Sequence, residues 1–127
     1  MATITRDSLS TEVLVNRLRK PNVGCIMSYV GIVRETSSTG QAALSIEFSS
    51  NEEAKDKLTW IENEARQRFD VQEVVISHRI GQFLVTDVIL AVAISAAHRQ
   101  AAFAACEWIV DEVKHVHSSW AVEELKN

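Results

Sequence analysis

Two adjacent polar residues, His98 and Arg99, stand where the sequence predicts that a buried strand ends and a helix begins. Residues 88–94 form an unbroken apolar run of strand length, and apolar residues recur at helical spacing from residue 100 to about 117. The first turn of a helix has unpaired backbone N–H groups and a partial positive charge. An arginine and a histidine at this point form a candidate receptor for an anion such as phosphate. The alternative is a capped helix with two solvated polar residues.

Lys114 is the second candidate for chemistry, because a helical wheel places it at the edge of the apolar face of the same helix. That face is formed by Phe103, Cys106, Ile109, Val110 and Val113. Partial burial at its edge would disfavour the charged ammonium and make the amine a better nucleophile or base. The alternative is a lysine whose apolar stem lies along the rim of the core while its charge stays in water.

The other polar residues match no common catalytic or metal-binding motif. His115 and His117 point to different faces of the helix, and neither Cys-x-x-Cys nor His-Glu-x-x-His occurs, which argues against a metal site. There is also no glycine-rich phosphate loop. His78 and Arg79 end a predicted strand, where they could pack locally or face a pocket.

Composition limits the class of protein. A chain of 127 residues is expected to form a single domain, 1–127. Its residues are 46% hydrophobic and 24% charged, which is ordinary for a globular protein in water. The net charge of −4 argues against nonspecific nucleic-acid binding. We see no membrane-spanning run and no signal-peptide core, and therefore expect a cytoplasmic protein. Cys25 and Cys106 lie in apolar runs and are interpreted as small buried residues in a reducing compartment.

Three helices must position these side chains. The first is expected to end near Leu18, with Asp7, Ser8 or Ser10 as its N-cap, and the second is expected to run from an Asn51 cap to about Phe69. The third is the helix that follows Arg99. The apolar side of the first helix is predicted to contain Leu9, Val13 and Leu18. The apolar stripe of the second is predicted to contain Ala54, Leu58, Ile61, Ala65 and Phe69, with Glu and Lys on the remaining positions.

Strands are predicted between the helices. They are expected over residues 24–33, 43–48, 74–80 and 88–94, with a candidate short strand at 3–5 and a loop at 35–40. Helices separated by pairs of strands favour an α+β fold, with an antiparallel or mixed sheet covered on one face by helices.

Four segments occur in an order and at intervals that match one known family. They are Gly31-Ile32-Val33-Arg34, His78-Arg79-Ile80-Gly81, Ser95-Ala96-Ala97-His98-Arg99, and Ile109-Val110-Asp111-Glu112-Val113-Lys114 followed by Trp120. These segments resemble the large, catalytic subunit of molybdopterin synthase, of the MoaE type. The resemblance covers roughly residues 22–123 and implies a hammerhead-like α/β arrangement.

The resemblance implies a sulfurtransferase of molybdenum cofactor biosynthesis, which converts a cyclic pyranopterin monophosphate into the dithiolene molybdopterin. Sulfur would come from a small, ubiquitin-like subunit with a thiocarboxylated C-terminal glycine, and no cofactor or metal is expected. The resemblance also implies a homodimer of large subunits within a heterotetramer. Arg34, His98 and Arg99 would bind the phosphate and the pterin, and Lys114 would be the lysine nearest the chemistry. Arginine suits bidentate binding of phosphate.

The chain departs from the family pattern after Trp120. A second lysine usually follows this tryptophan, and here the position is Ala121. The family's C-terminal tail is also shortened, and Lys126 is the nearest candidate replacement for the missing lysine. Two alternatives remain open. One is a degenerate member that binds the small subunit or the pterin without efficient turnover, and the other is an unrelated α+β ligand-sensing dimer.

Spacing along the third helix predicts a site shared between two chains. Fifteen residues (114 − 99) separate Arg99 from Lys114, which is roughly 22 Å at about 1.5 Å per residue. A pyranopterin monophosphate spans only about half of this length. If both ends serve one substrate, a two-fold homodimer would bring His98 and Arg99 of one subunit to Arg34 and Lys114 of the other.

Overall fold

The computed structural model describes residues 2–34 and 43–126, and their side chains except those of residues 43, 44 and 117–126. The predicted loop at 35–40 lies outside the described residues. In chain order the elements are β1 (Thr3–Thr5), α1 (Thr11–Leu18), β2 (Cys25–Ile32), β3 (Ala43–Phe48), α2 (Asn51–Arg68), β4 (Glu73–Arg79), β5 (Gly81–Leu84), β6 (Val88–Ala96), α3 (Arg99–Trp120) and β7 (Ala121–Lys126).

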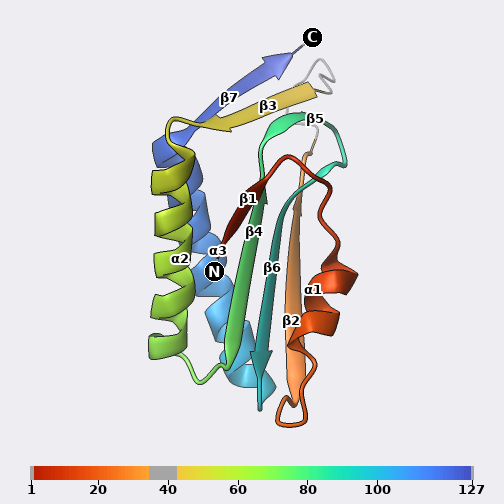
Figure 1. Cartoon of the computed structure of the whole chain (residues 1–127), viewed down its shortest axis with the longest axis vertical. Helices are drawn as coiled ribbons and strands as arrows, with labels where there is room; N and C mark the ends of the chain where they lie inside the picture. The colour runs from red at the N-terminus through yellow and green to blue at the C-terminus, as the bar shows by residue number, and fades with distance from the viewer. Residues whose placement is uncertain (1, 35–42, 127) are drawn as a thin grey trace.

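The larger sheet has four strands in the order β1-β4-β6-β2. β1 pairs with β4 in parallel, while β4 and β2 both pair with β6 in antiparallel fashion, so the sheet is mixed. β6 therefore lies inside the sheet, and all of its residues from Leu90 to Ala96 are buried (Figure 1). The predicted α+β class with a mixed sheet is confirmed, and the apolar run at 88–94 is the central strand.

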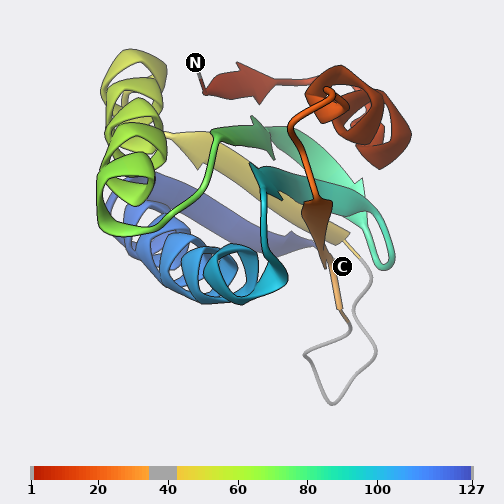
Figure 2. The same ribbon diagram turned by 90° about the horizontal axis from the view of Figure 1, so that it is seen from below.

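Helices cover both faces of this sheet. On one face, β6 residues such as Val92 and Ile94 pack into the core formed with α2 and α3. On the other face, Ala91 and Ala93 pack against Leu14 and Leu18 of α1, which lies opposite the other two helices (Figure 2). The predicted one-sided cover is therefore wrong. A strand that is apolar at every position has two faces to bury, since successive side chains alternate across a sheet.

The N-caps of the first two helices are serines. The Ser10 Oγ accepts a hydrogen bond from the Val13 backbone N–H at 3.3 Å, which confirms one of the predicted caps of α1. The Ser50 Oγ accepts from the Glu53 N–H at 3.2 Å, so Ser50, and not Asn51, caps α2. Each serine side chain therefore satisfies one of the backbone N–H groups that have no partner within the first turn of its helix.

The apolar faces of the helices differ from the prediction at three positions. Val13 is 57% exposed, and Leu14 is buried in its place. Phe103 is 59% exposed, because the small residues Ala102 and Ala105 are the ones that face the sheet from α3. On α2 the predicted stripe is buried, Phe69 only partly, but it also includes the charged residue Glu62, which was expected on the solvent side.

Glu62 is fully buried on α2, facing β4. One carboxylate oxygen, Oε2, accepts a hydrogen bond from the backbone N–H of Ile76 at 2.7 Å. Burial raises the pKa of the Glu62 carboxyl, and the hydrogen bond from Ile76 partly opposes that shift. The carboxyl therefore links the middle of α2 to the backbone of β4.

A second sheet has the order β5-β3-β7, with β3 antiparallel to both neighbours. It lies across one end of the larger sheet, at the top of Figure 1, where α3 leads into β7. Strands β5 and β7 were not predicted. Among the described residues, no helix is long and apolar enough to cross a membrane.

Candidate active site

A cavity of about 650 Å³ lies between the edge strand β2 and helix α3. It is lined by Tyr29, Val30, Gly31, Ile32, Arg34, His78, Ile89, Leu90, Val113 and Lys114. Two of the predicted site residues, Arg34 and Lys114, therefore meet in one cavity of a single chain. They are 80 residues apart in sequence (114 − 34), and the antiparallel pairing of β2 with β6, followed by the return of α3, brings them together.

Three strands supply the floor of this cavity at one level. Gly31 of β2 pairs with Leu90 of β6, and Leu90 pairs with His78 of β4. A Cβ atom added to Gly31 would lie 3.2 Å from the Leu90 Cβ and 3.7 Å from the Tyr29 Cε1. The missing side chain of Gly31 thus keeps space open above the sheet, next to Lys114.

Val33, which precedes Arg34 at the end of β2, is held in place by two backbone hydrogen bonds. The backbone N–H of Val33 donates to the Asp87 carbonyl at 2.9 Å, and the Thr86 N–H donates to the Val33 carbonyl at 2.7 Å. Thr86 has a φ of 79°, which is uncommon for a β-branched residue. The turn between β5 and β6 thus holds the backbone from which Arg34 projects.

Lys114 is exposed on α3, so of the two interpretations of this residue the structure favours the lysine whose charge stays in water over the partly buried amine. The helix is anchored on either side of it by the buried residues Val113 and Val116. Among the described residues, no carboxylate pairs with Arg34 or Lys114, and none lines the cavity. Two cations without a neighbouring carboxylate favour an anionic ligand.

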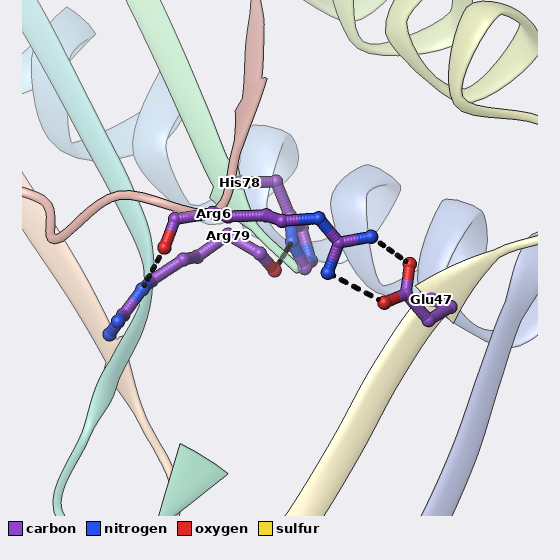
Figure 3. A network of polar contacts seen from close by, with 4 residues as sticks. All are labelled: Arg6, Glu47, His78 and Arg79. Atoms are coloured by element: carbon purple, nitrogen blue, oxygen red, sulfur yellow. Dashed lines mark hydrogen bonds and ion pairs between the residues drawn. The ribbon is translucent and has the colours of Figure 1, made fainter. Parts of the chain in front are cut away.

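His78 lies in the same cavity, at the end of β4, and is 2% exposed. Its Nδ1 donates to the Arg79 carbonyl at 2.9 Å, and the edge of its ring meets the Phe48 ring at a centroid distance of 5.0 Å. Arg79 in turn donates from Nε to the Arg6 carbonyl at 3.3 Å. Figure 3 shows the hydrogen bonds from His78 to Arg79 and from Arg79 to Arg6.

The same network joins the two sheets. The Arg6 guanidinium, which follows β1, makes a bidentate ion pair with Glu47 of β3 at 2.8 and 3.0 Å (Figure 3). The pair is exposed, so its main consequence is geometric: it fixes the second sheet beside the end of β4 where His78 lies.

His98 and Arg99 lie at the other end of α3 and do not line the cavity. Both are exposed, at the junction where β6 passes into the helix. The junction is packed tightly against the start of β2, because the Gly24 N–H donates to the Ala96 carbonyl at 2.9 Å. The structure thus separates the predicted residues into two groups, as the helical spacing predicted.

Lys126 ends β7, where it is paired with Ala43, and Ala121 begins the same strand. Their side chains lie outside the described part of the structure, so the possible replacement of the missing lysine remains a prediction. Cys25 and Cys106 are free and half-buried, which is less burial than predicted. Among the described side chains, no group of three or more His, Cys, Asp or Glu could hold a metal ion.

Tyr29 and Gly31 were not predicted as site residues, and for His78 both local packing and a place in a pocket were left open. Tyr29 gives no local signal, because its place depends on the register of β2 against β6. His78 did give a signal, since it is a titratable residue at the end of an apolar strand.

Together, the mixed sheet and the three helices define an α+β protein with a cavity that is lined by Arg34 and Lys114. Residues 4–116 match the family described as MoaE protein. A molybdopterin synthase catalytic subunit from Pyrococcus abyssi is 33% identical over 117 residues, which is 92% of this chain and 79% of that protein. Another from Thermoplasma volcanium is 29% identical over 124 residues, 98% of this chain and 90% of that protein.

The fold agrees with these sequence similarities. The structure of molybdopterin cofactor biosynthesis protein E from Burkholderia multivorans superposes with a TM-score of 0.80 at 33% identity, covering 89% of this chain and 75% of that one. The chain belongs to the MoaE protein family. This excludes the alternative that the chain is an unrelated α+β ligand-sensing dimer whose short motifs match the family by chance.

Proposed function

We propose that this chain is the large subunit of a molybdopterin synthase, which converts a cyclic pyranopterin monophosphate into the dithiolene molybdopterin. The observation that carries the proposal is the meeting of Arg34 and Lys114 in one cavity, in a chain of the MoaE protein family. The cavity of about 650 Å³ is within the range of small-molecule sites. Among the residues described around it, Arg34 and Lys114 are cations and none is a carboxylate, which suits a phosphorylated substrate.

Each predicted residue has a role in this proposal. Arg34 binds the phosphate or the pterin, as do His98 and Arg99, whose backbone and side chains form a positive helix entrance. Lys114 acts at the reacting carbon atoms, as nucleophile or proton carrier. Because Lys114 is exposed in the free chain, its desolvation must come from the substrate and the partner chains that close over the cavity.

The two groups of residues are brought together by a two-fold homodimer. Exposed apolar side chains flank both groups: Val30 and Ile32 lie beside the cavity, and Phe103 lies one turn after Arg99. Burial of these side chains would stabilise a contact in which the α3 entrance of one subunit meets the cavity of the other. A two-fold axis repeats this contact and completes two equivalent sites.

Sulfur comes from a small, ubiquitin-like subunit whose C-terminal glycine is thiocarboxylated, and one such subunit binds at each end of the homodimer. The C-terminal tail of that subunit enters the cavity and ends near Lys114. A dithiolene contains two sulfur atoms, so two thiocarboxylates are consumed for each product, and each leaves as a carboxylate. These reactions take place in the cytoplasm.

Lys126 replaces the lysine that is missing at Ala121. β7 continues directly from α3, so it runs on from the helix that carries Lys114. The competing proposal is a degenerate member that binds the small subunit or the pterin without efficient turnover, and Ala121 in place of the second lysine favours it.

The test is conversion of the cyclic precursor by this protein mixed with a thiocarboxylated small subunit. Lys114→Ala is expected to reduce turnover by about 10²-fold or more, while Lys55→Ala, an exposed lysine of α2, leaves it unchanged. Parental turnover in Lys114→Ala would remove the role of this lysine. Binding of the small subunit without any turnover by the parent protein would favour the degenerate member.

A further inference from the structure

The two sheets have four edge strands among the described residues, and β2 differs from the other three. β1 has three residues and β5 has four, while β7 has charged residues at three of its six positions. β2 has eight residues, none of which is charged and none of which is proline. Short length, charge and proline are features that keep an exposed edge from pairing with other chains, and β2 has none of them.

The outer edge of β2 is open in the single chain. The strand pairs with β6 on one side, and no described strand pairs with it on the other. In Figure 2, β2 lies at the end of the row of strands, and the helices lie to either side of that row. The apolar side chains of Val30 and Ile32 are 39% and 53% exposed along this strand. An edge with free backbone N–H and C=O groups and exposed apolar side chains is suited to pairing with a strand of another chain.

Helix α3 exposes a large apolar side chain on the same side of the molecule. α2 packs on β1 and β4, whereas α3 packs on β6 and β2. Trp108 marks the side of α3 that faces α2, because its ring contacts those of Trp60 and Phe69. Phe103 points about 140° away from Trp108 around the helix, toward the edge at β2. Phe103 is 59% exposed, so a chain that pairs with β2 would also bury this ring.

The length of β2 matches the separation between the two groups of site residues. Gly24, just before the strand, packs against the α3 entrance, whereas Gly31, near its end, lines the cavity. β2 spans seven residue steps (32 − 25), or about 23 Å at about 3.3 Å per residue. Along α3, Arg99 and Lys114 are separated by roughly 22 Å. An antiparallel copy of β2 would therefore set the α3 entrance of one chain beside the cavity of the other.

We propose that β2 pairs in antiparallel fashion with β2 of a second copy of this chain. The two larger sheets then join into one sheet of eight strands (2 × 4), and each cavity is completed by the α3 entrance of the other copy. The inference rests on the proposed function, because it takes from it the active site shared between two subunits. It adds the surface through which the two copies bind and the direction in which they pair.

The symmetry of this pairing restricts its register. A two-fold axis perpendicular to the sheet keeps α3 of both copies on one face, and directly opposite residues point to the same face. Because side chains alternate along a strand, one residue of β2 lies opposite its own copy. A register centred on Ser28 pairs all residues from Cys25 to Gly31 and sets the exposed Val30 against Ile26 of the other copy. Ser28 is small and exposed, so it fits beside its own copy at the axis.

Charges at Ser28 test this pairing. Directly opposite Cβ atoms are about 5 Å apart, so Ser28→Lys or Ser28→Asp places two like charges at the axis of each homodimer. A dimer of one variant with the other has opposite charges there. The two variants are mixed in equal amounts under conditions that exchange subunits, and native mass spectrometry measures the fraction of mixed dimers. The matched control is the parent mixed with Lys55→Asp, which brings together the same two charges at an exposed position of α2, away from β2.

We expect the like charges to weaken each homodimer about fivefold. This raises the fraction of mixed dimers from the statistical one half to about five sixths. The control pair should stay at about one half, because its charges lie outside the contact. Ser28→Ala should dimerise as the parent does. Formation of mixed dimers also shows that both charged variants fold.

A mixed fraction of one half for the Ser28 variants, or no dimer in their mixture, would overturn the inference. If the edge pairs instead with the tail of the small subunit, the mixed fraction would also be one half, and both variants would bind the small subunit more weakly. A parent protein that is monomeric at full turnover would overturn the shared site and the inference with it. Preferential pairing of the Ser28 variants without turnover by the parent would overturn the proposed function alone.

Discussion

The packing of Gly24 against the entrance of α3 gives a prediction whose size follows from the structure. A Cβ atom added at Gly24 would lie 2.0 Å from the Ala97 carbonyl oxygen, whereas real Cβ atoms are essentially never closer than 3.0 Å to such an atom. The backbone of Gly24→Ala must therefore open by about 1 Å (3.0 − 2.0). This displacement also strains the hydrogen bond from the Gly24 N–H to the Ala96 carbonyl.

The cost can be assembled from its parts. Overpacking costs about 1–3 kcal/mol, and loss of the hydrogen bond costs about 0.5–1.5 kcal/mol. Alanine lowers the conformational entropy of the unfolded chain relative to glycine, which stabilises the folded state by about 0.4–1 kcal/mol. We expect Gly24→Ala to lower the free energy of unfolding by about 0.5–4 kcal/mol. Because Ala97 directly precedes His98, the same displacement should move His98 and Arg99 and lower turnover.

Urea denaturation at a fixed chain concentration measures this change, with a midpoint lower by about 1 M for a chain of this size. Gly31→Ala is the milder comparison, because its added Cβ would lie 3.2 Å from the Leu90 Cβ and 3.7 Å from the Tyr29 Cε1, and not 2.0 Å from a backbone oxygen. Equal midpoints for Gly24→Ala and the parent would refute the reasoning, as would normal turnover in a variant that is destabilised as predicted.

Two further predictions concern stability. Thr86→Gly should raise the free energy of unfolding by about 0.5–1 kcal/mol in urea denaturation, because a β-branched residue at a φ of 79° is strained. An unfolding free energy below that of the parent would show instead that the Thr86 side chain stabilises the turn. Glu62 has a pKa raised above 4.5 by burial, so the stability it contributes is present below this pH and is lost as the pH rises through the folded-state pKa. The unfolding free energy of the parent should therefore fall relative to that of Glu62→Gln as the pH rises through this window, and a difference independent of pH would contradict the burial argument.

The central strand and the helix after it could be predicted because their signals are local. Residues 88–94 are apolar at every position, which is typical of a strand buried on both faces, and α3 has apolar residues at helical spacing. The separation of Arg99 from Lys114 follows from helix geometry alone. These features could be derived without knowing any tertiary contact.

Other features depend on contacts that a single sequence does not reveal. Phe103 was predicted in the core because it is large and apolar and lies on the apolar arc of the helical wheel. Instead, Ala102 and Ala105 face the sheet and allow α3 to approach it closely, so Phe103 points outward. Glu62 was assigned to solvent because it is charged, and its burial depends on the Ile76 N–H as a partner.

The candidate site could be predicted only in part for the same reason. Arg34 was proposed from a resemblance, and Lys114 was proposed first from its place on a helical wheel and then from the same resemblance. Their proximity depends on the register of β2 against β6 and on the path of α3. β5 has only four residues, too few for a periodic pattern. β7 has charged residues at three of its six positions and was not predicted as a strand.

Complementation between two inactive chains tests directly whether each active site is shared by two subunits. An Arg99→Ala chain and a Lys114→Ala chain are mixed in equal amounts under conditions that exchange subunits, and turnover is measured with the thiocarboxylated small subunit. Each mixed dimer then has one intact site and one site without either residue, and half of the dimers are mixed. We expect recovery of about one quarter of the parental activity. No recovery in a verified mixed dimer, or full activity in a monomer, would contradict it.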